Sequence, residues 1–373
     1  MAFEGRELRS KIDADGNLTL SLDVVQTDAP GDDEIVVRVE AAPINPSDLG
    51  LLLGPADLST LRPLEGRDGL ALTVPQQRLS SVTGRLGQAL PVGNEGAGTV
   101  VAAGRNAKAL EGRLVGMWGG AMYADYRKIA ARDVIPLPAG ATAADGASMF
   151  INPLTALGFV ETARREGHKA IIHTAAASNL GQMLQKICLA DDIPLINIVR
   201  SAEQVEILRG IGAAHVLNSQ DADFAEQLDA AVEATGATIA FDAIGGGPLA
   251  TQIMQTIEAV AARSMTTYSR YGSNQFKQLY IYGALDPSPL ILNRLRFGFE
   301  WSVSGWLLMP FLAKAGAEVV SRLQQRVADE LTTTFASHYS RVIGLAEALQ
   351  PDILRAYEKK ATGEKFLIAP SRG

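Results

Sequence analysis

Residues 169–201 read KAIIHTAAASNLGQMLQKICLADDIPLINIVRS, and this stretch decides the fold class of the chain. Apolar runs at 170–173 and 195–199 predict two buried strands, and the apolar spacing over 182–189 predicts a helix between them. The turn at 174–181 consists almost entirely of small side chains. Such a strand–turn–helix–strand unit lets backbone N–H groups and a helix N-terminus approach a pyrophosphate. The stretch therefore predicts dinucleotide binding.

The turn departs from the G-x-G-x-x-G pattern that is usual at dinucleotide sites. Ala175, Ser178 and Gly181 occupy the three key positions. We expect the alanine to keep its backbone at negative φ, the serine hydroxyl to offer a donor to phosphate oxygens, and the glycine to let the helix pack close to the strand. An ordinary α/β turn is the alternative interpretation. The strands and the helix that flank the turn favour nucleotide binding.

The residues after the second strand bear on the choice of cofactor. A site for NAD usually carries Asp or Glu there, whereas a ribose 2′-phosphate needs a cation. Arg200 and Ser201 follow the strand in this chain, and the first carboxylate is Glu203. A guanidinium and a hydroxyl suit a phosphate dianion. We expect NADPH rather than NADH, the alternative being a solvated arginine at a strand end.

Composition narrows the class of protein. The 373 residues are 47% hydrophobic with a net charge of −7, which favours a soluble two-domain protein and argues against nucleic acid as a partner. No apolar run has the length of a membrane span, and residues 1–11 show no secretory-signal pattern. The single cysteine, Cys188, excludes an intramolecular disulfide and fits a reducing compartment, so we expect a cytoplasmic location.

Two domains follow from the distribution of strand and helix patterns. Short strand patterns dominate before residue 140 and predict a β-rich barrel-like domain. Helices alternate with strands over 141–305, which predicts a doubly wound parallel sheet, and the tail at 306–373 is expected to complete the first domain. The expected helices include 143–163 and 345–360, with a last strand at 365–368.

Seven segments carry a resemblance to a known superfamily. They are Asn45-Pro46-Ser47-Asp48, Gly93-Asn94-Glu95-Gly96, Asn152-Pro153-Leu154-Thr155-Ala156, the phosphate turn, Arg209-x-Ile211-Gly212-Ala213-x-His215-Val216, Phe241-Asp242-Ala243-Ile244-Gly245-Gly246 and Tyr282-Gly283-Ala284-Leu285. In this order they resemble the medium-chain dehydrogenases/reductases over residues 34–368. Within that superfamily the chain is similar first to the NADPH-dependent 2-enoyl thioester reductases and next to the zinc-free quinone oxidoreductases. The resemblance implies a Rossmann domain and a GroES-like barrel domain.

A zinc site is not expected. Catalytic zinc needs Cys, His or carboxylate ligands that converge on one point, and a structural zinc lobe needs four cysteines. Asn94 stands where zinc-dependent relatives have a histidine, and Cys188 lies inside the nucleotide helix. The four histidines are scattered, and we interpret His173 and His215 as structural. The chain is therefore assigned no metal.

The resemblance has a gap at the proton donor. Enoyl thioester reductases of this type carry a tyrosine acid shortly after the Asn-Pro-Ser-Asp motif, and the matching position here is Ala56. The segment at 57–91 is also longer than its counterpart in the family. It carries four arginines, which are Arg62, Arg67, Arg78 and Arg85. The segment is either a solvated surface insertion or a binding surface for a phosphorylated acyl carrier.

The resemblance also implies a set of site residues. Asn45 and Thr155 are expected at the reacting centre, and Tyr123 or Tyr126 is a substitute proton donor. The residues expected to bind the cofactor are Thr155, Ala176, Ser178, Asn179, Leu180, Gly181, Arg200, Ser201, Ile244, Gly245, Tyr282, Gly283, Ala284 and Lys365.

These observations predict an oxidoreductase that uses NADPH to reduce an activated carbon–carbon double bond or a quinone without zinc. The alternative is a non-catalytic NADPH-binding protein of the same fold, which Ala56 favours and the intact Asn45 and Thr155 oppose. The partner is a small-molecule substrate. Alternating apolar residues at 296–306, beside the last sheet strand, predict a homodimer through a sheet edge.

Overall fold

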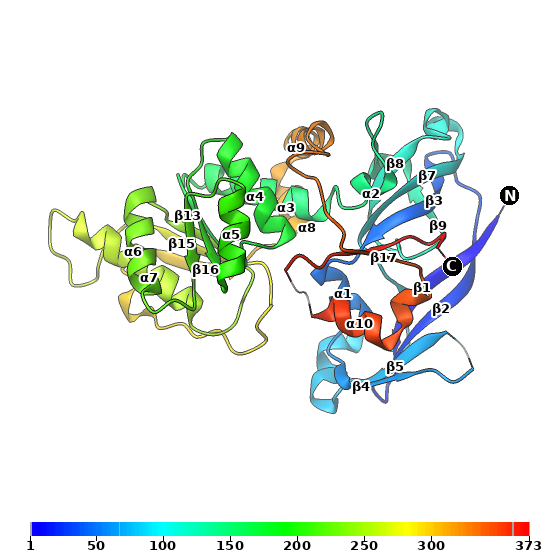
Figure 1. Cartoon of the computed structure of the whole chain (residues 1–373), viewed down its shortest axis with the longest axis horizontal. Coiled ribbons are helices and arrows are strands. Elements are labelled where there is room, and N and C mark those ends of the chain that lie inside the picture. Colours follow the sequence, from blue (N-terminus) through cyan, green and yellow to red (C-terminus); the bar gives the residue numbers. More distant parts are fainter. Residues whose placement is uncertain (1, 67, 360–361, 373) are drawn as a thin grey trace. The chain divides into compact units, whose positions relative to one another are not determined.

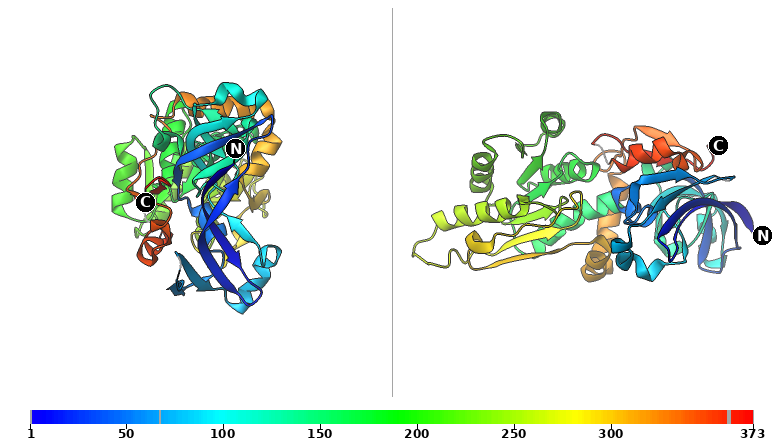
Figure 2. Two further views of the ribbon diagram at one scale, coloured as in Figure 1. Left: turned by 90° about the vertical axis from the view of Figure 1, so that its right-hand side faces the viewer. Right: turned by 90° about the horizontal axis from the view of Figure 1, so that it is seen from below.

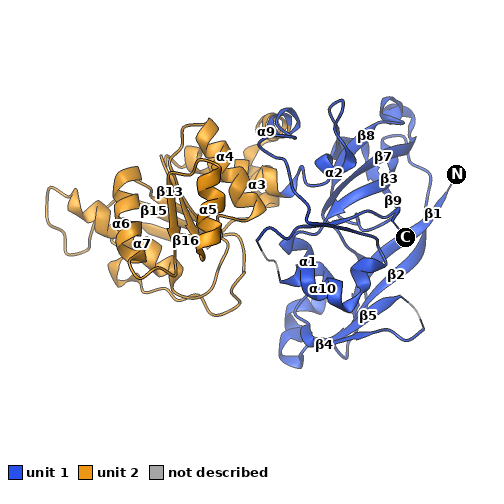
Figure 3. Ribbon diagram, viewed as in Figure 1, with its two compact units in different colours: residues 1–151, 325–373 blue, residues 152–324 orange. Residues whose placement is uncertain are grey.

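The computed structural model describes residues 2–66, 68–359 and 362–372. The chain divides into two compact units, unit 1 with Met1–Ile151 and Gln325–Gly373, and unit 2 with Asn152–Gln324 (Figure 3). The sequence patterns predict these divisions near residues 140 and 306. Within the residues that the structure describes, no helix combines the length and the apolar character needed to cross a membrane.

Unit 2 is built on a six-stranded parallel sheet (Figure 1). Its strands are β11 (Ile171–Thr174), β12 (Leu195–Val199), β13 (His215–Asn218), β14 (Ile239–Asp242), β15 (Lys277–Ile281) and β16 (Trp301–Gly305). Their order is β13-β12-β11-β14-β15-β16, which is the strand order 3-2-1-4-5-6 of dinucleotide-binding folds. The predicted doubly wound parallel sheet is confirmed.

Helices cover both faces of this sheet. They are α3 (Ile151–Arg165), α4 (Asn179–Ala190), α5 (Ala202–Gly210), α6 (Phe224–Thr235) and α7 (Leu249–Arg263). Two further helices, α8 (Leu308–Ala315) and α9 (Ala317–Asp329), follow the last strand, and the division between the units falls within α9. Side chains alternate between the faces along each strand. Ala240 of β14 belongs to the apolar cluster that includes α6 and α7, whereas its neighbour Phe241 stacks on Phe159 of α3 at 4.0 Å between ring centroids. Burial on both faces explains the continuous apolar runs in the sequence.

The helix expected at 143–163 is wrong as a single element. The structure has α2 (Ala143–Gly146), then a break, then α3. Pro153 explains the break, because a proline without an N–H fits only the first turn of a helix, where it lies in α3. Thr142 caps α2 by accepting from the backbone N–H of Asp145.

Unit 1 contains two sheets. Its strands are β1 (Phe3–Ile12), β2 (Asn17–Thr27), β3 (Glu34–Pro43), β4 (Asp57–Pro63), β5 (Gly69–Thr73), β6 (Ala89–Pro91), β7 (Glu95–Ala103), β8 (Leu114–Trp118), β9 (Tyr126–Ala130), β10 (Val134–Pro136), β17 (Arg341–Ile343) and β18 (Phe366–Ile368). One sheet has the order β4-β5-β2-β1-β6, and the other follows β10-β8-β7-β3-β18-β17 with β9 beside β3. The long β1–β2 hairpin is the dark blue pair in Figure 2.

The tail contributes to unit 1. β18 pairs antiparallel with β3, and α10 (Pro351–Glu358) precedes it. The helix expected at 345–360 instead begins at Pro351 after a short 3₁₀ turn, since proline favours the first helical position. Its expected last residue, Lys360, lies outside the described residues.

The segment at 57–91 is not a solvated insertion. It supplies β4, β5, a 3₁₀ helix (Gln76–Arg85) and β6 to the first sheet. Several of its apolar side chains join the core of unit 1, namely Leu61, Leu70, Leu72, Val74 and Leu79. Arginine content alone suggested a surface, but alternate positions of these strands face the core.

Candidate functional site

The turn between β11 and α4 places a helix N-terminus at the carboxyl edge of the unit 2 sheet. Ser178 is the N-cap of α4, and its hydroxyl accepts a hydrogen bond from the backbone N–H of Gly181 at 3.2 Å. A Cβ on Gly181 would lie 2.1 Å from the carbonyl oxygen of Ala176. Gly181 is therefore required for the close approach of helix and turn, as the sequence predicted for the third position of the motif.

Ala175 contradicts one expectation, since its φ is +50° and not negative. The left-handed conformation costs a residue with a Cβ about 1 kcal/mol or more. Two hydrogen bonds hold the turn in place, from the Ala176 N–H to the Ile198 carbonyl at 3.2 Å and from the Ser178 N–H to the Ala175 carbonyl at 3.0 Å. The small methyl group limits the strain at this position.

Asp242 organises the second turn of the site, after β14. Its carboxylate accepts from the Thr174 hydroxyl at 2.6 Å and from the backbone N–H groups of Ile244 and Gly245 at 3.0 Å each. It thus ties the end of β11 to the turn after β14. Asp242 belongs to the Phe241–Gly246 motif, but the sequence alone predicts no role for it. A buried carboxylate at the end of an apolar strand was the available signal.

Gly245 brings that turn against the segment after β15. Its φ is +79°, and a Cβ there would lie 2.7 Å from the carbonyl oxygen of Gly283. Ile244, Gly245 and Gly283 are therefore neighbours at the carboxyl edge of the sheet. Ala284 follows them in an exposed position.

Tyr282 pairs with a histidine rather than standing alone. Its hydroxyl lies 2.7 Å from Nε2 of His173, and the two rings stack with centroids 5.8 Å apart. Burial lowers the pKa of His173 to about 3, so the imidazole is neutral at physiological pH. Burial, followed by the nearby Asp242 carboxylate, raises the pKa of Tyr282. This agrees with a structural role for His173.

Arg200 and Ser201 follow β12. This strand is the neighbour of β11 in the sheet, and the dinucleotide turn follows β11. The Arg200 side chain is exposed, and its backbone N–H donates to Oε1 of Gln204 at 3.0 Å. Ser201 caps α5 by accepting from the Gln204 N–H at 3.4 Å. Thr155 lies in the second turn of α3 and is buried.

In unit 1, Asn45 caps α1 (Pro46–Leu52), and Asp48 holds the entry to this helix. The Asp48 carboxylate accepts from the backbone N–H of Asn45 at 2.7 Å and from the backbone N–H of Asn94 at 2.8 Å. Burial raises the pKa of Asp48 to about 7, against the opposing effect of these two donors. The Asn-Pro-Ser-Asp and Gly-Asn-Glu-Gly motifs are thus brought together by one carboxylate.

Glu95 makes a second buried contact with the same motif. Its Oε1 accepts from Nδ2 of Asn45 at 2.8 Å, and its Oε2 accepts from the backbone N–H groups of Phe150 and Ile151 at 2.9 Å each. Burial raises the pKa of Glu95, and the positive charge of Lys365 opposes that shift most strongly. Sequence reasoning assigned no role to Glu95, because its partners lie about fifty residues away on either side.

Tyr123, expected as a substitute proton donor, is fully buried. Its hydroxyl donates to the carbonyl oxygen of Pro43 at 3.0 Å, and burial raises its pKa well above the usual value. That hydrogen is therefore already engaged within unit 1. Tyr126 is half-buried against Phe3, with ring centroids 5.3 Å apart. Ala56 lies half-buried beyond α1 and offers no polar group.

Lys365 precedes β18 and lies in a polar cluster of unit 1. Its ammonium group donates to the Ser148 hydroxyl at 2.7 Å, and the Tyr339 hydroxyl donates to the same oxygen at 2.8 Å. Burial lowers the pKa of Lys365 to about 8, while the Glu95 and Asp48 carboxylates act in the opposite direction. Its expected contact with a cofactor stays a prediction.

The described arginines of the 57–91 segment differ in their surroundings. Arg85 donates to the Leu51 carbonyl at 2.9 Å and to the Ser10 hydroxyl at 2.8 Å, so it binds the C-terminal end of α1. Arg62 and Arg78 are exposed, and Arg67 lies outside the described residues.

Comparisons with known proteins show that the chain is similar to several reductases. No protein-family model matches the chain. It is 28% identical over 240 residues to a mitochondrial enoyl-[acyl-carrier-protein] reductase of Xenopus tropicalis, which covers 61% of this chain and 60% of that protein. The chain thus spans less than two thirds of the length of that curated relative, and 54% of its counterpart in Bos taurus. A candidate NADPH:quinone reductase of Mesorhizobium loti is 26% identical with a TM-score of 0.73, covering 98% of both chains.

The enoyl thioester reductase Etr1p, solved with NADP and crotonyl-CoA, has the same fold at 18% identity with a TM-score of 0.69, covering 98% of this chain and all of that one. The resemblance to the zinc-independent medium-chain dehydrogenases/reductases is confirmed. Among the described residues, no group of three or more His, Cys, Asp or Glu side chains is arranged to hold a metal ion. At the position where zinc-dependent members carry a histidine, Asn94 donates through Nδ2 to the Ser47 hydroxyl at 3.0 Å.

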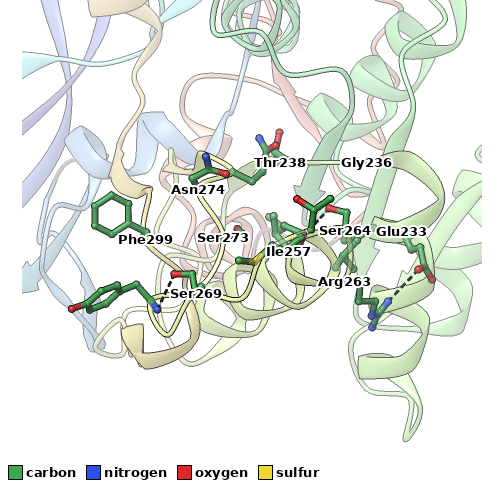
Figure 4. A pocket seen from close by; sticks show the side chains of 18 of the residues that line it. Glu233, Gly236, Thr238, Ile257, Arg263, Ser264, Ser269, Ser273, Asn274 and Phe299 are labelled. Carbon is green, nitrogen blue, oxygen red and sulfur yellow. Dashed lines mark hydrogen bonds and ion pairs between the residues drawn. The ribbon is translucent and has the colours of Figure 1, made fainter.

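A separate cavity of about 1030 Å³ lies in unit 2 away from these residues (Figure 4). Its lining comes from the ends of α6 and α7 and from the loop before β15, including Arg263, Ser269 and Asn274. These elements meet at the amino edge of the sheet. Ligands of doubly wound sheets bind at the carboxyl edge, so this cavity is not the predicted dinucleotide site.

Proposed function

We propose that the chain is an NADPH-dependent reductase of activated carbon–carbon double bonds or quinones. The observation that carries the proposal is the turn after β11, where Gly181 leaves no room for a Cβ and the N-terminus of α4 opens at the carboxyl edge of a 3-2-1-4-5-6 sheet. Oriented N–H groups of this kind bind a pyrophosphate. Two of the similar structures support the choice of cofactor, since one is named as an NADPH:quinone reductase and the other is a complex with NADP.

The side chains around this turn fit the parts of NADPH. The Ser178 hydroxyl and the N-terminal residues of α4 at 179–181 would face the pyrophosphate, and Arg200 with Ser201 would meet the 2′-phosphate by a charge-assisted contact. From the resemblance we also assign to the cofactor Ile244, Gly245, Tyr282, Gly283, Ala284, Ala176, Leu180 and Thr155 of unit 2. Lys365 and Asn45 of unit 1 are assigned on the same ground, Lys365 to the cofactor and Asn45 to the reacting centre. The cofactor supplies a hydride, and the protein orients it in a site that excludes water.

The class of electron acceptor depends on which groups can protonate the reduced product. A reduced enoyl thioester needs a proton on carbon, whereas a reduced quinone takes protons on oxygen, which water can supply. Tyr123 is already engaged with Pro43, and Ala56 has no proton to give. This favours a quinone or an activated alkene that accepts a solvent proton. Enoyl thioesters remain supported by the names of the relatives.

A single plate assay tests the proposal. Purified protein is mixed with NADPH and, in parallel, with 1,4-benzoquinone, an enone or crotonyl-CoA, and the loss of NADPH absorbance is followed. We expect loss of NADPH with at least one acceptor. In parallel wells that contain NADP⁺ instead, we expect no formation of NADPH from ethanol or sorbitol, because the described residues offer no cluster of zinc ligands whose metal would lower the pKa of an alcohol. Tight NADPH binding without turnover of any acceptor would overturn the proposal in favour of a non-catalytic NADPH-binding protein.

We further propose a cytoplasmic homodimer that forms through β16, the edge strand of the unit 2 sheet. Phe299 just before this strand is 66% exposed and Leu307 just after it is 65% exposed, which is unusual for side chains of this size at a sheet edge. The single reduced cysteine, Cys188, agrees with the location. Light scattering that gave a monomer at micromolar concentration would contradict the dimer.

A further inference from the structure

The loop between α7 and β15 is longer than this connection needs. α7 ends at Arg263 and β15 begins at Lys277, whereas about 2–6 residues usually join a helix to the next strand of such a sheet. This loop lines much of the cavity of about 1030 Å³ at the amino edge of unit 2 (Figure 4). Ligand pockets usually occupy about 300–1000 Å³, and long loops are usually functional. The cavity is therefore a candidate binding site.

A buried ion pair holds this loop in one conformation. The ammonium group of Lys277 is fully buried and donates to Oε2 of Glu258 at 2.7 Å. Its two other contacts are with the Ser273 hydroxyl at 3.2 Å and the Gln275 carbonyl at 2.6 Å. The Glu258 carboxylate also accepts from the Ser273 N–H at 2.7 Å and from the Ser273 hydroxyl at 2.5 Å. Buried charges are costly unless they are fully partnered, so this arrangement makes the loop a fixed wall of the cavity.

The charged side chains in the described lining neutralise each other. They are Arg263 and Glu233, whose Nη1 and Oε1 atoms lie 3.4 Å apart and are joined by a dashed line in Figure 4. Nη2 of Arg263 also donates to both carboxylate oxygens of Asp229, at 2.7 and 2.6 Å. A charged ligand would lose its water here without gaining a free partner of opposite charge. The lining therefore favours an uncharged ligand.

The rest of the lining offers ring faces and neutral polar groups. Tyr268 and Tyr271 line the cavity and are 89% and 60% exposed. The face of an aromatic ring packs well against the C–H groups or the edge of a second ring. Hydroxyl and amide side chains, which both donate and accept hydrogen bonds, come from Ser264, Thr266, Thr267, Asn274 and Gln275. This chemistry matches a ring that carries hydroxyl groups.

Thr238, also in the lining, acts as an acceptor towards a ligand. Its hydroxyl lies 2.7 Å from Nδ1 of His168. Nε2 of the same ring is buried 3.9 Å from Oε2 of Glu166, with no hydrogen-bond partner among the described residues. Burial lowers the pKa of His168, so the ring carries one proton, and the facing carboxylate favours that proton on Nε2. Nδ1 then accepts from the Thr238 hydroxyl, whose oxygen is left to accept from a ligand.

We propose that this cavity binds an uncharged ring compound whose ring packs on Tyr268 and one of whose hydroxyl groups donates to Thr238. Two sources share this chemistry, a sugar in its pyranose form and a phenolic ring with several hydroxyl groups. The site lies at the edge of the sheet opposite to the dinucleotide turn. Binding there does not depend on the proposed reductase function.

Ligand-observed NMR of the full chain tests the site with two uncharged probes, methyl β-D-glucopyranoside and resorcinol. Each has a charged counterpart with a similar ring, methyl β-D-glucuronide and 3,5-dihydroxybenzoate. We expect at least one uncharged probe to bind, and its counterpart to bind about tenfold more weakly, because the carboxylate loses water without gaining a partner. The probe that binds identifies the source.

Two pairs of variants locate the bound probe. Thr238→Val removes the acceptor and should weaken binding about tenfold, whereas Thr238→Ser keeps the hydroxyl and should stay within about twofold of the wild type. Tyr268→Ala removes an exposed ring and should weaken binding about fivefold. Leu295→Ala is its matched control, because Leu295 is 85% exposed and does not line the cavity, and it should change nothing. Urea denaturation checks that each variant is folded.

The outcomes are decisive in either direction. The site is refuted if neither uncharged probe binds the wild type at up to about 10 mM. It is also refuted if Tyr268→Ala weakens binding no more than Leu295→Ala, or if Thr238→Ser and Thr238→Val lose affinity equally. Displacement of the probe by NADPH would place it at the dinucleotide turn and refute the separate site, while supporting the proposed function. Absence of NADPH turnover, by contrast, would refute only the proposed function.

Discussion

The two units hold their candidate site residues by different means. In unit 2 the turns at the dinucleotide site require glycine, because a Cβ at Gly181 or Gly245 would clash with backbone oxygens. In unit 1 the cluster around Asn45 depends on buried carboxyl groups, because those of Asp48 and Glu95 accept hydrogen bonds from backbone N–H groups away from water. Larger side chains at the two glycines should therefore abolish the function of the unit 2 turn. Changes in the protonation of Asp48 and Glu95 should instead destabilise the unit 1 cluster.

The largest effect is expected from adding atoms to the unit 2 turn. Gly181→Val would place carbon within 2.1 Å of the Ala176 carbonyl oxygen, so the turn and α4 must separate. We expect NADPH binding to disappear and the free energy of unfolding to fall by about 3 kcal/mol, measured by titration and by urea denaturation. Gly210→Ala is the matched control, because nothing lies near a Cβ at that position at the end of α5. If Gly181→Val still bound NADPH, the close approach of α4 and the turn would not be required for binding.

The buried charge of unit 1 is tested by pH. Burial raises the pKa of Asp48 from 3.8 to about 7 in the folded chain, so the protonated form is favoured by folding. Stability from this group is fully present below about pH 4 and is lost as the pH rises through about 7. Between these values, the free energy of unfolding of the wild type should fall relative to Asp48→Asn by up to about 4 kcal/mol. Parallel pH profiles of the two proteins would contradict the raised pKa.

The same contrast explains which features the sequence could predict. The sheet of unit 2 and its phosphate turn follow from local patterns, since apolar runs, small residues and Gly181 act on their immediate neighbours. The positive φ of Ala175 did not follow, because hydrogen bonds to the distant Ile198 strand stabilise it. The roles of Asp242 and Glu95 also escaped prediction, because each depends on partners from separate segments.

Unit 1 shows a further limit. The β1–β2 hairpin was not predicted, since charged residues such as Arg6, Glu7 and Arg9 obscure the strand pattern of β1. Pairing with β2 over ten residues stabilises β1 as a strand, although the local sequence has a low strand propensity. The break before α3 was readable in principle from Pro153. The 57–91 segment was interpreted either as a solvated insertion or as a binding surface because it carries four arginines. Its leucines, which join the core of unit 1, indicate instead that it is part of the sheet.

The contribution of charge to unit 2 is tested at the end of β12. Arg200→Asp replaces the exposed guanidinium by a carboxylate, which would face the 2′-phosphate. We expect NADPH affinity to fall by about 1.5–3 kcal/mol and NADH affinity to stay the same or rise. Arg209→Asp on α5 makes the same change in net charge, and its side chain pairs with Glu206 instead. Equal binding of NADH and NADPH by the wild type would refute the role of Arg200.

The smallest expected change is in the free energy of unfolding when single arginines of unit 1 are replaced. Arg85 donates to the Leu51 carbonyl at the end of α1 and to Ser10, and burial lowers its pKa, so removing it leaves buried acceptors without partners. Arg85→Ala should lower the free energy of unfolding by about 1–2 kcal/mol, whereas Arg62→Ala, at an exposed position of β4, should change it by less than about 0.5 kcal/mol. Urea denaturation measures both. If instead Arg62→Ala weakened turnover of an acyl-carrier substrate while stability held, the segment would be an anion-binding surface after all, and unit 1 would use exposed as well as buried charge.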